Sequence, residues 1–114
     1  MDTHQLQASR EGRSEERKIF RTSGTLFQRG HAPLPIKTLD ISTMGIGVMS
    51  PEAVREGTTC GIDFSGFAGD RKLHVQVMAR VVYCICVGTT GFRLGFQFTD
   101  VPPDMRVAIN QLVA

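Results

Sequence analysis

The sequence contains no tryptophan, a single tyrosine and no strong excess of charge of either sign. Proteins that bind single-stranded nucleic acid stack bases on exposed aromatic rings along a basic groove. Here most phenylalanines alternate toward one face of the expected strands. Thirteen Lys and Arg residues against eleven Asp and Glu leave a net charge of only +2. These shortages argue against a nucleic-acid polymer as partner, and a small-barrel binder of single strands remains the less favoured class.

Long apolar segments are missing as well. The longest uninterrupted apolar run, Val81 to Val87, is far shorter than the roughly 20 residues that a membrane-spanning helix needs, so no membrane insertion is expected. Residues 1–21 are polar and charged and contain no apolar core of a secretory signal. Cys60, Cys84 and Cys86 make an odd number of thiols, which fits a reducing compartment better than a disulfide framework. We therefore expect a cytoplasmic protein.

Patterns that would indicate catalysis or metal binding are also scarce. A structural zinc site needs four nitrogen or sulfur ligands at recognisable spacing, and the few cysteines and histidines are dispersed. Cys84 and Cys86 lie on one face of an expected strand, where small half-buried thiols are the simpler interpretation. The pair Cys60 and His74 has no supporting motif for nucleophilic catalysis. No enzymatic activity, metal or cofactor is expected.

What the sequence does contain is a succession of short strand patterns separated by glycine, proline and polar turns. Apolar and polar residues alternate through residues 72–82, which predicts a strand with one buried face that continues, with a bend, to Val87. Residues 92–98 alternate in the same way, with the phenylalanines on one face. The other expected strands are 22–29, 34–42, 45–50 and 58–64, and connections are expected at 51–57 and 65–70.

The two ends of the chain differ in character. Residues 1–16 carry almost no large apolar side chain, which predicts a flexible N-terminal arm. Residues 104–113 place apolar side chains at helical spacing, with Asp104 suited to the N-terminal end of a helix. Short strands at close spacing favour closure into a barrel, because closure removes exposed edges. We expect an all-β fold with a terminal helix: one domain over residues 17–114, built as a small antiparallel β-barrel.

The most specific motif is the run Asp40-x-Ser42-x-x-Gly45, for which this composition predicts roughly 0.03 matches by chance. On a strand, Asp40 and Ser42 project to one face while Leu39 and Ile41 project to the other, which we expect to be the barrel interior. An outward carboxylate can accept two hydrogen bonds from a planar N–H pair such as the guanine edge. The glycine allows close approach of backbone or ligand. The alternative is turn chemistry, in which the Asp or Ser side chain ends the strand.

A second candidate element is the pair Arg17 and Arg21, four residues apart at the start of the expected barrel. Guanidinium groups bind phosphate in a bidentate manner and also stack on purines. The spacing alone has little specificity, because about one such pair is expected by chance among the ten arginines. Beside Glu15 and Glu16 the pair also fits a solvated helical face with ion pairs along it.

Together these elements resemble the PilZ domain family. That family has R-x-x-x-R in an N-terminal segment and D/N-x-S-x-x-G further along, on a six-stranded β-barrel with a C-terminal helix. The segment 92–98 is also similar to the closing strand of the family. The matching positions are Arg17, Arg21, Asp40, Ser42 and Gly45.

The resemblance implies that the chain binds cyclic di-GMP, a bacterial second messenger. Arg17 and Arg21 would contact guanine and phosphate groups, Asp40 and Ser42 would read guanine and phosphate edges, and Gly45 would permit close approach. Outside the motif, Arg13 and Lys18 are further candidates for ligand contacts. Ligand binding would change the conformation and regulate an unidentified protein partner in motility, biofilm or exopolysaccharide control. A PilZ-like interaction module that binds no nucleotide is the alternative.

Overall fold

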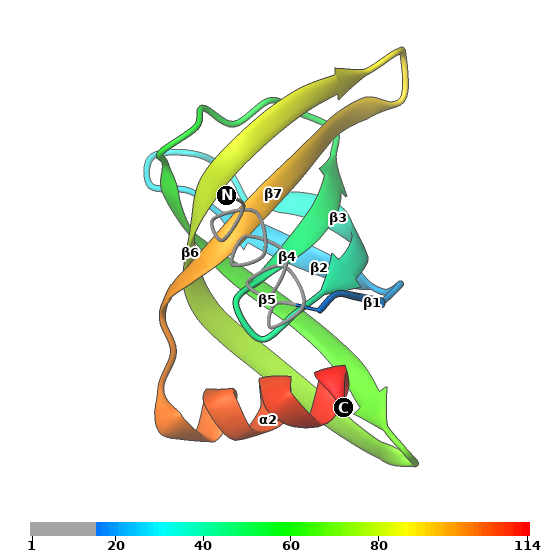
Figure 1. Ribbon diagram of the computed structural model, residues 1–114. Helices are drawn as coiled ribbons and strands as arrows, with labels where there is room; N and C mark the ends of the chain where they lie inside the picture. Colours follow the sequence, from blue (N-terminus) through cyan, green and yellow to red (C-terminus); the bar gives the residue numbers. More distant parts are fainter. Residues whose placement is uncertain (1–15) are drawn as a thin grey trace, which may run out of the picture.

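The computed structural model describes residues 16–114, so the expected arm lies outside the described residues except for Glu16. Strands and one C-terminal helix account for most of the described chain (Figure 1). Their bounds are β1 Lys18–Ile19, β2 Ser23–Phe27, β3 Leu34–Ile41, β4 Gly45–Ser50, β5 Thr59–Ala68, β6 Arg71–Val87, β7 Gly91–Asp100 and α2 Pro103–Val113.

The strands form a closed barrel. Their order in the sheet is β1-β3-β2-β5-β6-β7-β4, and an additional pairing of β3 with β4 joins the two ends. All pairings are antiparallel. Since β1 and β2 pair with successive parts of β3, the closed cylinder has six strands and β1 is a short addition to it. The expected six-stranded antiparallel barrel with a terminal helix is confirmed.

The core consists of the inward-facing side chains of this cylinder, as the period-2 patterns predicted. In β6, burial alternates residue by residue from Leu73 to Val81. In β7, Leu94 and Phe96 are buried, and Phe92 and Phe98 pack against the core. The largest fully buried side chains are Phe64, Leu26, Ile41, Ile46, Ile62, Leu94, Ile109, Val48, Val75 and Val81.

One end of the barrel is covered by α2. Ala108, Ile109 and Leu112 are the buried residues of this helix, which contacts β5 and β6. Phe20 packs beside it, with its ring 5.6 Å from the Phe64 ring in an edge-to-face arrangement. Gly66 is required at this place, because a Cβ there would lie 2.5 Å from the Phe20 ring and 2.9 Å from Leu112. Among the described residues, no helix has the length and apolar character to cross a membrane.

Several expected boundaries differ from the structure, most by one or two residues. The loop predicted at residues 65–70 is wrong, because β5 continues to Ala68 and only a tight turn through Gly69, with φ of +65°, precedes β6. Ser65 and Gly66 obscured the strand pattern there. The short strand β1 was not predicted either. The helix begins at Pro103, one residue before the expected start.

Register shifts interrupt the strand pairing at three positions, one of which lies between Met78 and Ala79. The β3–β4 register shifts between Thr38 and Asp40, so that Thr38 and Ile41 are both buried and Leu39 is the extra residue. The prediction that Leu39 faces the barrel interior is therefore wrong, because the bulge reverses the alternation at this point. The third shift, between Val81 and Tyr83, makes Val82 the extra residue of β6.

Candidate functional site

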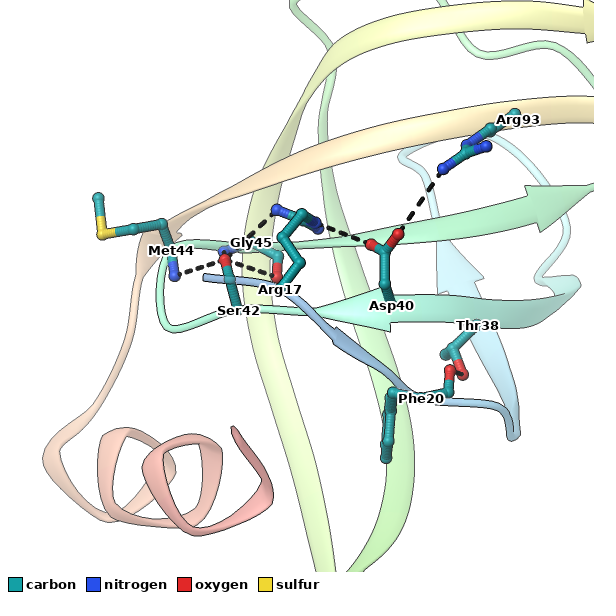
Figure 2. Close-up of polar contacts among 8 residues, drawn as sticks. All are labelled: Arg17, Phe20, Thr38, Asp40, Ser42, Met44, Gly45 and Arg93. Carbon is teal, nitrogen blue, oxygen red and sulfur yellow. Dashed lines mark hydrogen bonds and ion pairs between the residues drawn. The ribbon is translucent and has the colours of Figure 1, made fainter. Parts of the chain in front are cut away.

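A carboxylate between two arginines marks the outer wall of the barrel. Asp40 lies near the end of β3, and the Nε atom of Arg17 donates a 2.9 Å hydrogen bond to its Oδ1 (Figure 2). On the other side, Nη2 of Arg93 in β7 lies 3.6 Å from Asp40 Oδ2. All three side chains are partly exposed: 41% for Arg17, 23% for Asp40 and 46% for Arg93. The cluster is therefore open to a ligand, although the carboxylate already has charged neighbours.

Ser42 has a different environment from the one expected. It is fully buried, and its Oγ accepts hydrogen bonds of 3.1 Å from the backbone N–H groups of both Met44 and Gly45. Arg17 Nη1 lies 3.4 Å from the same oxygen. The hydroxyl therefore stabilises the β3–β4 turn and contacts Arg17. It does not lie exposed beside Asp40. The turn-forming role that the sequence left open is present here.

Glycines shape the surface between these groups. A Cβ at Gly45 would collide with the Phe96 carbonyl oxygen of β7, so this glycine permits close strand pairing and not only ligand approach. A Cβ at Gly47 would lie 2.8 Å from Asp40 Oδ1, which means that the carboxylate rests directly over this residue. A Cβ at Gly95 would overlap the ring of Tyr83.

The strand register places these residues in one row across four strands. Asp40 pairs with Gly47, Gly47 with Gly95, and Gly95 with Tyr83. We call Gly47 and Gly95 the glycine shelf: two buried glycines of the barrel wall, of which Gly47 lies beneath the Asp40 carboxylate and Gly95 beneath the Tyr83 ring. These two side chains suit a planar ring system, because an aromatic ring offers stacking area and a carboxylate accepts N–H groups.

The two motif arginines are not brought together. Arg17 lines a shallow hollow with Gly45, Phe96 and Gln97, whereas Arg21 lines a separate hollow with Lys37 and Leu39. Between them the pairing of the chain with β3 is irregular, since β1 ends at Ile19 and β2 begins at Ser23.

Thr38 holds this irregular stretch in place. Its Oγ1 donates a 2.6 Å hydrogen bond to the Phe20 carbonyl oxygen and accepts a 2.8 Å hydrogen bond from the Thr22 amide. Phe20 therefore turns into the core, which separates the two guanidinium groups in the described arrangement.

The remaining candidates are placed as follows. The Nζ atom of Lys18 donates to the Leu112 and Ala114 carbonyl oxygens at the end of α2, at 3.3 and 3.0 Å, and so faces the helix instead of the shelf. Arg13 lies outside the described residues. Arg93 and Tyr83 were not predicted as site residues, although Arg93 occupies the polar face of the expected closing strand. Only the pairing of β7 with β4 and β6 shows that these side chains border the shelf.

The two titratable groups of residues 16–114 whose pKa is clearly shifted lie elsewhere on the barrel. Partial burial raises the pKa of Asp63, but hydrogen bonds from Gln76 at 2.8 Å and His74 at 2.6 Å, with the attraction of His74, hold that pKa below its ordinary value. Burial raises the pKa of the Cys60 thiol. Neither group borders the glycine shelf, so the electrostatics of the candidate site depend on Asp40 and its arginines.

Comparison with solved structures supports the fold. The inhibitor of motility MotI/DgrA from Bacillus subtilis superimposes with a TM-score of 0.70 at 10% identity, over 85% of this chain and 47% of that chain. PlzA from Borreliella burgdorferi, in complex with c-di-GMP, gives 0.63 at 16% identity, over 96% of this chain and 46% of that one. This chain thus spans about half the length of both proteins. The PilZ domain of YcgR from Escherichia coli, with c-di-GMP, gives 0.58 at 19% identity, over 87% and 89%.

Sequence comparison gives the family directly. The curated proteins yield no match. The family model described as the PilZ domain matches residues 11–114, which is nearly the whole chain and includes both motifs. Together with the closed six-stranded barrel, this match establishes that the chain belongs to the PilZ domain family.

Proposed function

We propose that this protein binds cyclic di-GMP on the glycine shelf and acts as a non-catalytic receptor for that nucleotide. Family membership and two structural neighbours determined with c-di-GMP support the choice of ligand. The observation that carries the proposal is the position of Asp40, a partly exposed carboxylate held over Gly47 on the outer wall. A guanine base presents two adjacent N–H donors, and a carboxylate accepts both.

Arg17 already presents such a donor group to the same carboxylate. Its guanidinium bonds to Asp40 and contacts Ser42, so it occupies the place where a guanine edge would bind. On ligand binding, Arg17 exchanges this contact for a phosphate or for the guanine, and Arg21 turns toward the ligand from its separate hollow. Charge-assisted hydrogen bonds contribute about 1.5–3 kcal/mol each, so replacement of one set by another leaves a modest net gain. We expect a dissociation constant of about 1 µM that rises with salt concentration.

The borders of the shelf add two contacts to the motif residues. Arg93 supplies a second cation beside Asp40 and is free to turn toward phosphate, because nearly half of its side chain is exposed. The Tyr83 ring lies against Gly95, where it offers a stacking surface for a purine. Gly45 keeps β4 close to β7, and Ser42 maintains the turn that aims Arg17 and Asp40 at each other.

A route from the shelf to the helix accounts for signalling to a protein partner. Arg17 is followed directly by Lys18, which binds the C-terminal end of α2. Arg106 of α2 donates a 2.6 Å hydrogen bond to the Thr43 carbonyl oxygen in the β3–β4 turn. Movement of Arg17 toward a ligand would therefore affect both ends of α2, the C-terminal end through Lys18 and the N-terminal half through Arg106. We propose that the resulting shift of α2 alters the surface that the protein partner binds.

Titration calorimetry with c-di-GMP tests the proposal. Asp40→Ala and Arg17→Ala should each weaken binding by roughly tenfold to hundredfold, since each removes at least one charge-assisted hydrogen bond. Asp100→Ala and Arg55→Ala are matched controls, because both side chains are exposed and lie away from the shelf. They should bind as the unchanged protein does.

Parallel titrations identify the class of ligand. No heat with c-di-GMP at low or high salt would contradict nucleotide binding and favour an interaction module instead. Binding of a short oligonucleotide in the same buffer, without binding of c-di-GMP, would favour the nucleic-acid class. Equal affinity of the Asp40 and Arg17 variants and the unchanged protein would show that the site lies elsewhere.

A further inference from the structure

Strand β6 is longer than the strand on one of its sides. Its pairing with β5 ends at Arg80, and the last backbone contacts on that side join Val81 to residues 57 and 58. From Val82 to Val87, β6 pairs with β7 alone among the described residues. The β6–β7 hairpin consequently projects beyond the rest of the barrel (Figure 1). We call residues 82–87 on the side away from β7 the open edge.

The open edge carries free backbone groups in a regular pattern. The Val87 carbonyl oxygen accepts from the Thr90 amide in the hairpin turn and therefore points toward β7. Because hydrogen-bonding residues alternate along an antiparallel strand, the N–H and C=O groups of Cys84 and Cys86 point away from β7. Such groups are a template for another strand.

Nothing in this stretch protects the edge against pairing. Proteins usually protect edge strands with charged residues, proline or a covering loop. Residues 81–87 contain no charge and no proline. Ile85 is 53% exposed and Val87 38% exposed, which leaves an apolar row on the outer face of the hairpin.

We infer that the open edge pairs with the open edge of a second copy of this chain, antiparallel about a two-fold axis at Ile85. In this arrangement Ile85 lies opposite Ile85 of the second copy, and Tyr83 lies opposite Val87 of the second copy. Cys84 lies opposite Cys86 of the second copy, which brings the free backbone groups of both strands together. Every opposed pair is uncharged, so the edge is complementary to itself.

Other positions of the axis are less compatible with the structure. An axis at Cys84 would place Val87 of the second copy opposite Val81, whose backbone groups are already bonded to residues 57 and 58. An axis at Cys86 would oppose Cys84 to Gly88 in the hairpin turn. Only an axis at Ile85 uses the paired segment 83–87 completely. This inference does not depend on nucleotide binding.

Sedimentation velocity of the full chain under reducing conditions, over a range of concentrations, gives the first test. The unchanged protein should show a concentration-dependent dimer. Ile85→Lys should raise the dissociation constant of that dimer by about tenfold or more, because like charges would then lie directly opposite each other. Val107→Lys is the matched control, since Val107 is 56% exposed but lies on α2. A protein that stays monomeric, or an equal response of both variants, would overturn the inference.

Charge complementation then distinguishes a second copy from any other occupant of the edge. Ile85→Lys and Ile85→Glu should each be monomeric, and an equimolar mixture of the two should form a heterodimer, because opposite charges face each other only across a shared axis. Failure of the mixture to associate would assign the edge to a different partner.

Cross-linking with diamide tests the register. Diamide takes two electrons and two protons from two thiols, so that one disulfide forms between Cys84 and Cys86 of the two copies. Cys60→Ser should retain the covalent dimer, since Cys60 is buried. Cys84→Ser or Cys86→Ser should lose it. Cross-linking that persists in either of these two variants would contradict the axis at Ile85.

Discussion

Substitution of Gly47 by alanine provides a sharp test of the shelf, because it disturbs Asp40 without removing it. The added Cβ would lie 2.8 Å from Asp40 Oδ1 and 3.5 Å from its Cγ. Ordinary contact begins near 3.4 Å, so the carboxylate must withdraw by about 0.6 Å, a movement that its flexible side chain allows at low cost. The 2.9 Å hydrogen bond from Arg17 is then lengthened or lost.

The effects on stability and on binding should differ in size. An exposed ion pair such as Arg17–Asp40 contributes about 0.2–1 kcal/mol. Replacement of glycine by alanine recovers about 0.4–1 kcal/mol through the unfolded chain. The free energy of unfolding should therefore change by less than about 1 kcal/mol. Affinity for c-di-GMP should fall by roughly tenfold to hundredfold, since a charge-assisted hydrogen bond to the guanine edge is misplaced.

Calorimetric titration and urea unfolding of the same samples measure both quantities. Gly61→Ala is the matched control, because a Cβ at that strand position meets its nearest neighbour at an ordinary 3.6 Å. In the Asp40→Ala background, Gly47→Ala should have no further effect on binding, because the group on which it acts is gone. Full affinity of Gly47→Ala, or an equal additional loss without Asp40, would refute this account of the shelf.

Three further predictions concern the barrel that supports the site. Thr38→Val should lower the free energy of unfolding by about 1–3 kcal/mol in urea titrations, because the Thr22 amide loses its buried partner; unchanged stability would show that water replaces the hydroxyl. Gly45→Ala should lower the melting temperature more than Gly47→Ala does, since its Cβ meets the rigid backbone of Phe96 instead of a flexible side chain. The reverse order would contradict the reasoning. The pKa of Asp63 is lowered by folding, so its contribution to stability is present above the ordinary Asp value of 3.8 and is lost as pH falls through the lower folded value. Asp63→Asn should reduce that acid-side loss in pH-dependent unfolding, and an unchanged pH profile would exclude this linkage.

Much of the fold follows from the sequence because a half-buried strand has a simple period. The alternation through residues 72–82 and 92–98 fixes two strands and their inward faces, and the helical spacing near Ile109 fixes α2. The alternation of buried and exposed side chains is interrupted where a β-bulge inserts an extra residue. The bulge at Leu39 cannot be detected from hydrophobicity, because a leucine fits either face, and β1 has only two residues to show any pattern.

The candidate site was predictable in part. The motif locates Asp40 and the turn at Ser42, because both depend on local chain geometry. The borders of the shelf come from β6 and β7, more than forty residues further along the chain, and become visible only when the strand order is known. For the same reason the sequence could not predict that the Arg17 and Arg21 side chains lie in different hollows. Their placement depends on the buried Thr38 side chain, which holds the irregular backbone between them.

The close spacing of Arg17, Lys18 and Phe20 has a consequence for how this domain can vary. Within four residues the chain contacts the outer wall, the end of α2 and the barrel core. A single inserted residue between the first and the last of these would rotate one group to the wrong face, as in any extended segment. A substitution in this segment removes one of these contacts, whereas a change in its length would disconnect the outer wall from the helix even if every contributing side chain were retained.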